Sequence, residues 1–322
     1  MRKLIVSSLV LLSSFASCQQ KQSPGTTTKS QEMMDQKMLD IYKQVKTYDY
    51  NPLYEVVFSQ DACGYEIIIN GLPLHRYLLL GSANEQHIPI NDHILTSGKQ
   101  EMIIRLFPPQ LSDQRWSPTL VDASKFKIKV IHHSADNATE NYKQVFEFST
   151  ANKPGTEKFL GSGQKVFEFK GYFDAEVPYQ LKGWRNSEDL SKEDQDKLLK
   201  EAIAAYNNFR NILIKKNVNA YASLMYEKEV ELAKAFYWNT PADAKERWEE
   251  MSGKVREKRD ILPLKDFKMV LYAGGKVLTL QPTSEMYKDY FSAIHAQTED
   301  DDIQVSFMLH KKAGSSELTP IR

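Results

Sequence analysis

The spacing of apolar residues changes once along this chain of 322 residues, and the change divides the chain into two parts. From residue 54 to about residue 173, apolar residues alternate with polar ones, as Phe126, Ile128 and Val130 do between lysines. A period of two predicts β-strands with one buried face. From residue 191 to about residue 255 the apolar residues recur every three or four positions, which predicts amphipathic helices.

The first part is expected to form an antiparallel β-sandwich domain over residues 32–182. Asn70-Gly71 is typical of a tight hairpin turn, and Pro108-Pro109 ends a strand. Many short strands separated by turns are typical of a sandwich. A short amphipathic helix within residues 32–45 is expected to cover this domain. The predicted strands are 54–58, 65–69, 74–80, 101–107, 125–130, 143–149 and 165–173.

Residues 65–106 resemble the jelly-roll modules that accompany bacterial glycosidases. The resemblance rests on Asn70-Gly71-Leu72-Pro73-Leu74, on the segment from Ile88 to Leu95 and on the segment from Ser97 to Leu106. Gln100 stands where these modules usually have Asn. The matching residues are turn and core positions, so the resemblance implies a fold and no activity; in such modules the sandwich binds sugar, binds protein or fills space.

The second part, residues 190–322, is expected to be an α+β domain of helices followed by an antiparallel meander. Ser191-Lys192-Glu193-Asp194 has the form of a capping box, and Thr240-Pro241-Ala242-Asp243 combines a cap with a proline at the first helical position. This order of elements is loosely similar to the NTF2-like or cystatin-like arrangement, a likeness that carries no function. The predicted strands are 268–272, 276–280, 290–294 and 303–309.

The first eighteen residues have the layout of a bacterial export signal. Arg2 and Lys3 precede an apolar run over residues 4–12, which is too short to cross a bilayer as a helix. Phe15-Ala16-Ser17 in front of Cys18 resembles the lipobox of bacterial lipoproteins, with Phe15 where Leu is usual. The resemblance implies cleavage before Cys18 and a diacylglyceryl thioether on its sulfur, which would anchor the protein to a membrane.

A lipid on Cys18 has consequences for the rest of the chain. Residues 1–17 would be a signal peptide, and residues 18–31, rich in Gln, Lys, Ser and Thr, would be a flexible tether. Gln19 and Gln20, where inner-membrane lipoproteins carry Asp, favour the periplasmic face of the outer membrane. Cys63 would then have no intramolecular partner, so a buried, inert thiol is expected there.

The composition and motifs favour no nucleic acid, cofactor or metal. The 42 basic residues balance 42 acidic ones, so no basic excess points to nucleic acid. The chain contains no His-Glu-x-x-His, Cys-x-x-Cys, Gly-x-Ser-x-Gly or phosphate loop, so no local motif identifies catalytic residues. His132 and His133 are neighbours on a strand and therefore point to opposite faces. Residues 299–302 are acidic but lack the ligand spacing of a calcium loop.

Two Arg–Trp pairs in loop-like segments are the candidate interface residues. Because interfaces favour Arg and Trp, a protein-binding role is one interpretation, and packing between the two domains explains each tryptophan equally well. The candidate interface residues are Arg115, Trp116, Trp184 and Arg185.

We expect a non-enzymatic, lipid-anchored envelope protein that binds a protein partner. An immunity protein that neutralises a periplasm-directed toxin is one specific version. A glycan-binding lipoprotein with Trp116 in a sandwich groove is an alternative. A hydrolase with a pocket formed by Tyr206, Tyr221 and Glu227 is another; however, Glu227 and Glu231 share a helix face with lysines, which favours a salt-bridged surface.

Overall fold

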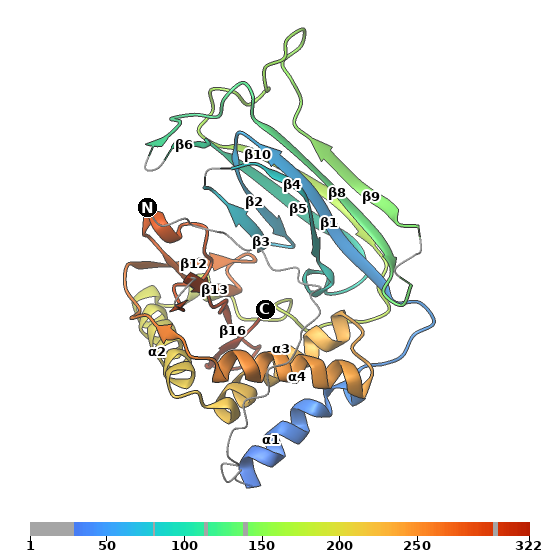
Figure 1. The fold of residues 1–322 in the computed structure, drawn as a ribbon, viewed down its shortest axis with the longest axis vertical. Helices are drawn as coiled ribbons and strands as arrows, with labels where there is room; N and C mark the ends of the chain where they lie inside the picture. Colours follow the sequence, from blue (N-terminus) through green and yellow to red (C-terminus); the bar gives the residue numbers. More distant parts are fainter. Residues whose placement is uncertain (1–28, 80, 113–114, 138–140, 299–301) are drawn as a thin grey trace.

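The computed structural model describes residues 29–79, 81–112, 115–137, 141–298 and 302–322 (Figure 1). The signal, Cys18 and most of the predicted tether lie outside the described residues. The predicted mixed architecture with antiparallel sheets is confirmed: two four-stranded sheets come first, followed by three helices, a three-stranded sheet and a four-stranded sheet of shorter strands. No helix in the described part of the chain has the length and apolar character needed to cross a lipid bilayer.

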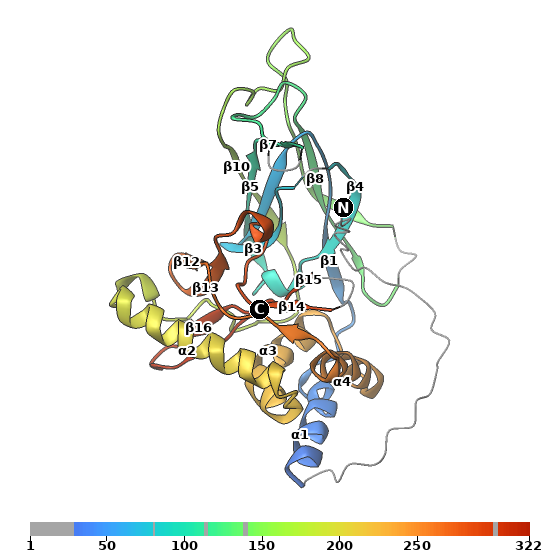
Figure 2. The same ribbon diagram turned by 60° about the vertical axis from the view of Figure 1, so that its left-hand side comes forward.

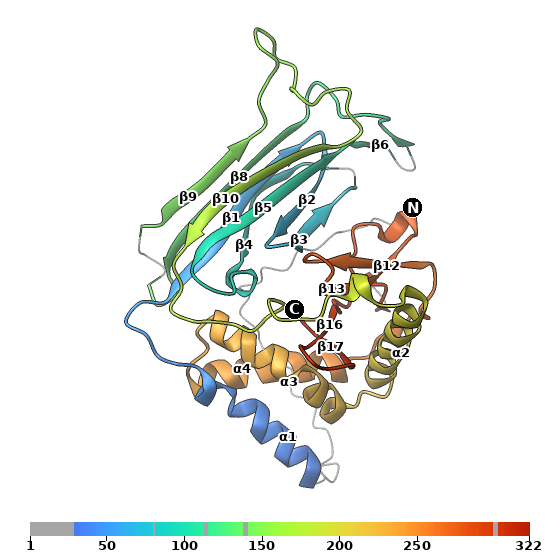
Figure 3. The ribbon, with the colours of Figure 1, turned by 180° about the vertical axis from the view of Figure 1, so that it is seen from behind.

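The first part consists of two antiparallel sheets that face each other (Figures 1 and 3). Sheet A has the strand order β4 (Ala83–Pro89), β1 (Pro52–Asp61), β8 (Lys125–Ser134) and β9 (Lys143–Ser149). Sheet B has the order β10 (Phe167–Ala175), β5 (Gly98–Phe107), β2 (Gly64–Ile69) and β3 (Leu72–Tyr77). The sequence did not predict β4, because this edge strand is largely solvent-exposed and rich in polar residues.

The two sheets enclose one core of alternating side chains. Phe58 of sheet A lies 5.3 Å from Tyr65 of sheet B, measured between ring centres. Phe126, Ile128 and Val130 are buried, as their alternation with lysines predicted. Cys63 is also buried, and burial raises the pKa of its thiol to about 12, so the thiolate is scarce at neutral pH.

The second part begins with α2 (Gln195–Ile214), α3 (Val218–Ala235) and α4 (Pro241–Arg256). Thr240 caps α4 and Pro241 is its first residue, as predicted, and Thr240 also forms a capping box with Asp243. At α2 the prediction is wrong, because Asp194 itself is the N-cap and accepts from the backbone of Lys197. Ser191 instead donates to Asp189 within a short 3-10 turn, Leu190–Lys192.

Two small antiparallel sheets complete this part. One has the order β11 (Asp260–Ile261), β14 (His295–Gln297) and β15 (Asp302–Gln304). The other has the order β12 (Phe267–Tyr272), β13 (Val277–Pro282), β16 (Leu309–Lys311) and β17 (Leu318–Pro320). The strand predicted over 290–294 is wrong, because side chains satisfy the backbone there: Phe291 N–H donates to Gln304 and its carbonyl accepts from Thr279.

The N-terminal helix α1 (Lys29–Leu39) packs on α3 and α4, at the end of the molecule away from the sandwich (Figure 2). Met38 is buried in the core of the helical part, together with Ile41 of the following turn. This corrects the prediction that the helix covers the sandwich domain. A period of three to four indicates an apolar stripe, but it does not show which apolar surface the stripe covers.

The two parts share buried surface. The core of the sandwich includes Tyr237, Val277, Phe291 and Met308 from the second part. The β2–β3 turn also approaches the β12–β13 turn closely: Ala273 N–H donates to the Gly71 carbonyl at 3.0 Å. At Gly71 a side chain would lie 2.8 Å from the Ala273 backbone, and φ is +81°, so glycine meets both requirements.

Candidate functional site

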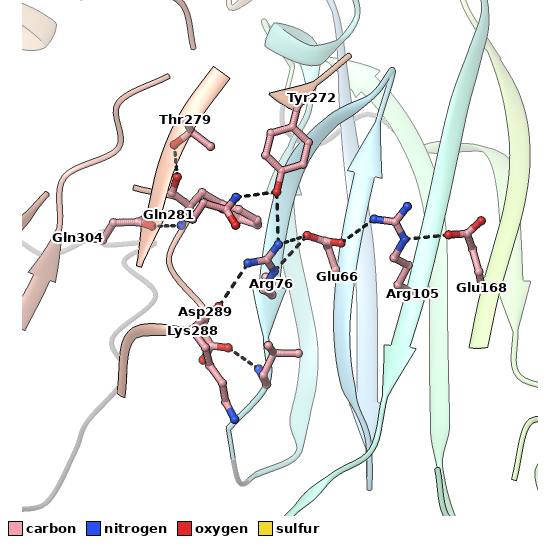
Figure 4. Close-up of polar contacts among 12 residues, drawn as sticks. Glu66, Arg76, Arg105, Glu168, Tyr272, Thr279, Gln281, Lys288, Asp289 and Gln304 are labelled. Atoms are coloured by element: carbon pink, nitrogen blue, oxygen red, sulfur yellow. Dashed lines mark hydrogen bonds and ion pairs between the residues drawn. The ribbon is translucent and has the colours of Figure 1, made fainter. Parts of the chain in front are cut away.

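Contact between the two parts centres on Arg76 of β3 (Figure 4). Its Nε donates to Glu66 Oε1 at 3.0 Å, and Nη2 contacts the same oxygen. Other N–H groups of the guanidinium donate to the Lys288 carbonyl and the Tyr272 hydroxyl, each at 3.3 Å. The guanidinium also lies 4.5 Å from the centre of the Phe291 ring. One sandwich side chain is therefore held by three residues of the second part.

Arg76 belongs to a row of alternating charges across the outer face of sheet B. Glu168, Arg105, Glu66 and Arg76 occupy paired positions on β10, β5, β2 and β3. Arg105 donates to Glu168 at 2.8 Å and to Glu66 at 3.2 Å. Glu66 is only 3% exposed, so its charge depends on these two arginines for compensation.

Asp289 lies at the edge of this contact, next to Lys288 and between the 3-10 turn Glu285–Tyr287 and β14. Its Oδ1 accepts from the Leu78 backbone N–H at 2.6 Å (Figure 4). Burial raises the pKa of Asp289 to about 6, although this hydrogen bond and the nearby positive charges of Lys288 and Arg76 act to lower it. The carboxyl group therefore titrates in a range where an exposed aspartate would already be ionised.

The linker between the two parts is fixed by Glu231 of α3. Its carboxylate accepts from the backbone N–H groups of Lys182 at 2.9 Å and Gly183 at 3.1 Å. The same carboxylate lies 3.1 Å from the Arg322 guanidinium. Glu231 is thus a structural acceptor for the linker, whereas Glu227 forms the predicted kind of surface ion pair, with Lys312.

A groove of about 430 Å³ lies where the linker and the β12–β13 turn meet the sandwich. Four segments form its walls: the Asn70-Gly71 turn, residues 95–101, the linker at Trp184 and Arg185, and residues 273–276. Trp184 is 5% exposed, and its indole N–H donates to the Asn70 carbonyl at 3.2 Å. Both parts of the molecule therefore supply the walls, and the walls are tied to each other.

The groove contains three cationic side chains, from Lys99, Arg185 and Lys276. Arg185 is exposed, and its guanidinium makes no hydrogen bond or ion pair to the described residues. Lys276 donates one hydrogen bond, to the Arg185 carbonyl at 2.5 Å. Lys99 lies 4.2 Å from the centre of the Tyr172 ring. Each of the three cations therefore retains N–H groups for a ligand.

The acidic and amide acceptors of the groove are already used. Glu101 forms an ion pair with Lys170. Asn70 Oδ1 accepts from the Glu101 backbone N–H at 3.0 Å, and Gln100 Oε1 accepts from Asn70 Nδ2 at 2.7 Å. The groove therefore presents more free donors than free side-chain acceptors, a balance that favours an anionic ligand.

The four predicted interface residues are divided between two places. Trp184 and Arg185 line the groove. Arg115 and Trp116 form β7 (Arg115–Trp116), which pairs with β6 (Gln110–Ser112) outside the groove. The ammonium group of Lys288, from the second part, lies over the Trp116 ring. Trp116 therefore contacts a residue of the second part, and Trp184, in the linker, contacts Asn70 of the first part and Arg322 of the second.

The residues suggested for a hydrolase pocket do not face a common opening. Tyr206 is fully buried, and its hydroxyl donates to the Phe307 carbonyl at 2.5 Å. Tyr221 packs against Phe209 at a ring distance of 5.9 Å. Because Glu227 is exposed and paired with a lysine, the three side chains have separate structural roles.

Ser187 and His310 form a nucleophile–base pair that the sequence analysis did not single out. Ser187 Oγ lies 2.6 Å from His310 Nδ1. Burial lowers the pKa of His310 to about 4, and both residues are at least 90% buried. A nucleophile must reach its substrate, so we interpret this pair as a contact that holds the linker to β16.

The described residues also contain no cluster of three or more His, Cys, Asp or Glu side chains that could hold a metal ion.

Comparison of the chain with protein-family models, curated proteins and solved structures found no match. The candidate site therefore rests on its own geometry.

Among the groove cations, the sequence analysis identified Arg185 but missed Lys99 and Lys276. No local signal marks these lysines, because each comes from a different segment and only the packing of the two parts brings them together.

The first prediction concerns the Arg76 contact. Arg76→Met should lower the free energy of unfolding by about 3–5 kcal/mol, because it leaves the buried Glu66 carboxylate with one arginine fewer. Chemical denaturation at neutral pH measures the loss. The double variant Glu66→Leu/Arg76→Met should lose clearly less than the single variant, since it removes the buried Glu66 charge together with the arginine. Equal losses in the two variants would contradict this account of the contact.

The second prediction concerns pH. The pKa of Asp289 is raised from 3.8 to about 6 in the folded protein, so the folded state holds this proton more tightly than the unfolded state. The resulting stabilisation is complete below pH 3.8 and is lost as the pH rises through 6. The Tm of the wild type should therefore fall relative to that of Asp289→Asn between pH 4 and pH 6.5 in thermal unfolding. A constant difference would show that Asp289 does not titrate in this range.

Proposed function

We propose that the protein is a lipid-anchored envelope protein that binds a protein partner through the groove at the junction of its two parts. One observation carries the proposal: both parts supply walls to the groove, and a shared core and a buried ion network hold these parts in one arrangement. A site that is formed before binding loses little conformational freedom when a partner enters.

The proposed lipid anchor fits the position of α1 in the fold. With a lipid on Cys18 and the outer membrane as its location, residues 19–28 would join the periplasmic membrane surface to α1. Ten residues span at most about 35 Å. Because α1 lies at the end of the molecule away from the sandwich (Figures 1 and 2), the sandwich would project away from the membrane, towards partners in the periplasm.

Binding of a secreted toxin is the specific version of this function that we favour, because neutralisation requires a rigid complementary surface and no chemistry. Glycan binding has less support: Lys288 covers one face of the Trp116 ring, which leaves less of the ring for a sugar to stack on. The jelly-roll, NTF2-like and cystatin-like similarities remain proposals about the fold and carry no part of the function.

The third prediction tests partner binding. The chain from residue 19 onward, without its lipid, should retain one protein in stoichiometric amount from an envelope and secretome extract after a salt wash. The groove variant Lys99→Gln/Arg185→Gln/Lys276→Gln should lose this protein. The control variant Lys143→Gln/Lys200→Gln/Lys245→Gln removes the same charge from exposed sites outside the groove and should retain it. Mass spectrometry identifies the captured protein; an identical set from all three baits would contradict binding through the groove.

The fourth prediction tests the anchor. In a Gram-negative host, the full chain should incorporate radiolabelled palmitate and sediment with the outer membrane. Cys18→Ser should remove both the label and the sedimentation, since the thioether requires the Cys18 sulfur. Cys63→Ser should remain labelled, because the Cys63 thiol is buried. Label retained by Cys18→Ser would show that the protein is not lipidated at that residue.

A further inference from the structure

The chemistry of the groove indicates the kind of partner segment that it accepts. Arg185 provides an exposed guanidinium whose planar fork of N–H groups matches a carboxylate. Lys99 and Lys276 provide two ammonium groups from the other walls, and neither has a carboxylate partner among the described residues. The groove thus holds three cationic side chains that form no ion pair with a described residue; Asp174 of β10 occupies the position opposite Lys99 without pairing with it.

This excess of positive charge is local. The whole chain has 42 basic and 42 acidic residues, so a general basic character does not explain it. The one carboxylate in the walls, that of Glu101, is already paired with Lys170, which lies outside the groove. The balanced overall charge also disfavours nucleic acid, which binds extended basic surfaces.

The size and backbone of the groove disfavour a small inorganic anion. The groove has a volume of about 430 Å³, so a single phosphate would fill only a small part of it. Phosphate cradles use free backbone N–H groups in a turn. In the turn at residues 273–276, the N–H groups of Ala273, Gly275 and Lys276 all donate to backbone carbonyls of this protein.

The aromatic residues of the groove disfavour a sugar. Stacking on a sugar requires an open ring face, and Trp184 is 5% exposed. Tyr172, on the neighbouring part of sheet B, is 46% exposed, but Lys99 lies over its ring. The remaining interactions that the groove offers are salt bridges and hydrogen bonds to extended, negatively charged groups.

We infer that the groove binds an acidic peptide segment of the partner, whose Asp and Glu carboxylates pair with Arg185, Lys99 and Lys276. The inference rests on the proposed function, in that a protein partner supplies the segment. A short run of acidic residues is larger than a single phosphate and carries several separated negative charges. It can therefore reach the cations on all three walls of the groove. Pairing of this kind sets the specificity and the rate of association of a complex.

A fluorescein-labelled hexaglutamate peptide tests the inference by fluorescence anisotropy. The lipid-free chain from residue 19 onward should bind this peptide, bind it more weakly as NaCl is raised from 20 to 150 mM, and not bind hexaglutamine. The variant Lys99→Gln/Arg185→Gln/Lys276→Gln should bind it at least about ten-fold more weakly, since each lost charged contact weakens a complex severalfold. The control variant Lys143→Gln/Lys200→Gln/Lys245→Gln should change the affinity less than about two-fold.

Two further measurements keep the result decisive. If the triple variant proves unstable, the single variant Arg185→Glu replaces it. It alters one exposed residue, so it should fold normally, and it should abolish binding of the peptide. Inorganic phosphate and polygalacturonate serve as competitors at matched ionic strength. Equal losses in the groove and control variants, or stronger groove-dependent binding of either competitor than of the peptide, would overturn the inference.

The outcome can be separated from that of the proposed function. Groove-dependent capture of a partner without hexaglutamate binding would leave the proposed function in place and refute the acidic segment. Groove-dependent hexaglutamate binding without any captured protein would support the ligand chemistry and count against the role in the envelope.

Discussion

The buried carboxylate of Glu66 is the constraint on which the arrangement of the two parts depends. A charge that is 3% exposed is tolerated only with close opposite charges, and here Arg105 and Arg76 provide them. Arg76 in turn has N–H groups left over, which the Lys288 carbonyl and the Tyr272 hydroxyl satisfy. The need to pair one charge on sheet B therefore extends to the second part of the chain and fixes its position.

The groove is a consequence of this fixed arrangement. Its four wall segments are far apart in the sequence, and they meet because the turn at Gly71 lies against Ala273 and because the Trp184 indole donates to the Asn70 carbonyl. Since these contacts are made within the protein, the walls stand in place without a ligand. Lys99, Arg185 and Lys276 line the groove and form no ion pair with the described residues, which is more typical of a binding site than of a folding contact.

Much of the local structure could be predicted from the sequence. The strand over 143–149 matches β9, and the Thr240 capping box starts α4, because both depend on neighbours in the sequence. The predictions failed where residues far apart in the sequence determine how an element packs. The three-to-four spacing predicted a helix at α2, but only the packing of the helix shows that Leu198 and Ala202 are among its buried residues. The placement of α1 failed for the same reason: an apolar stripe does not identify the surface that it covers.

The sequence by itself determined where strands give way to helices, which cysteine is buried and inert, and that no local catalytic motif is present. These properties follow from periodicity and residue type over short distances. Only the tertiary structure decided that Trp184 packs between the parts, that Glu231 holds the linker, and that Lys99, Arg185 and Lys276 share one groove. The physical reason is that each of these relations joins residues far apart in the chain, and burial and charge pairing, which act through space, bring them together.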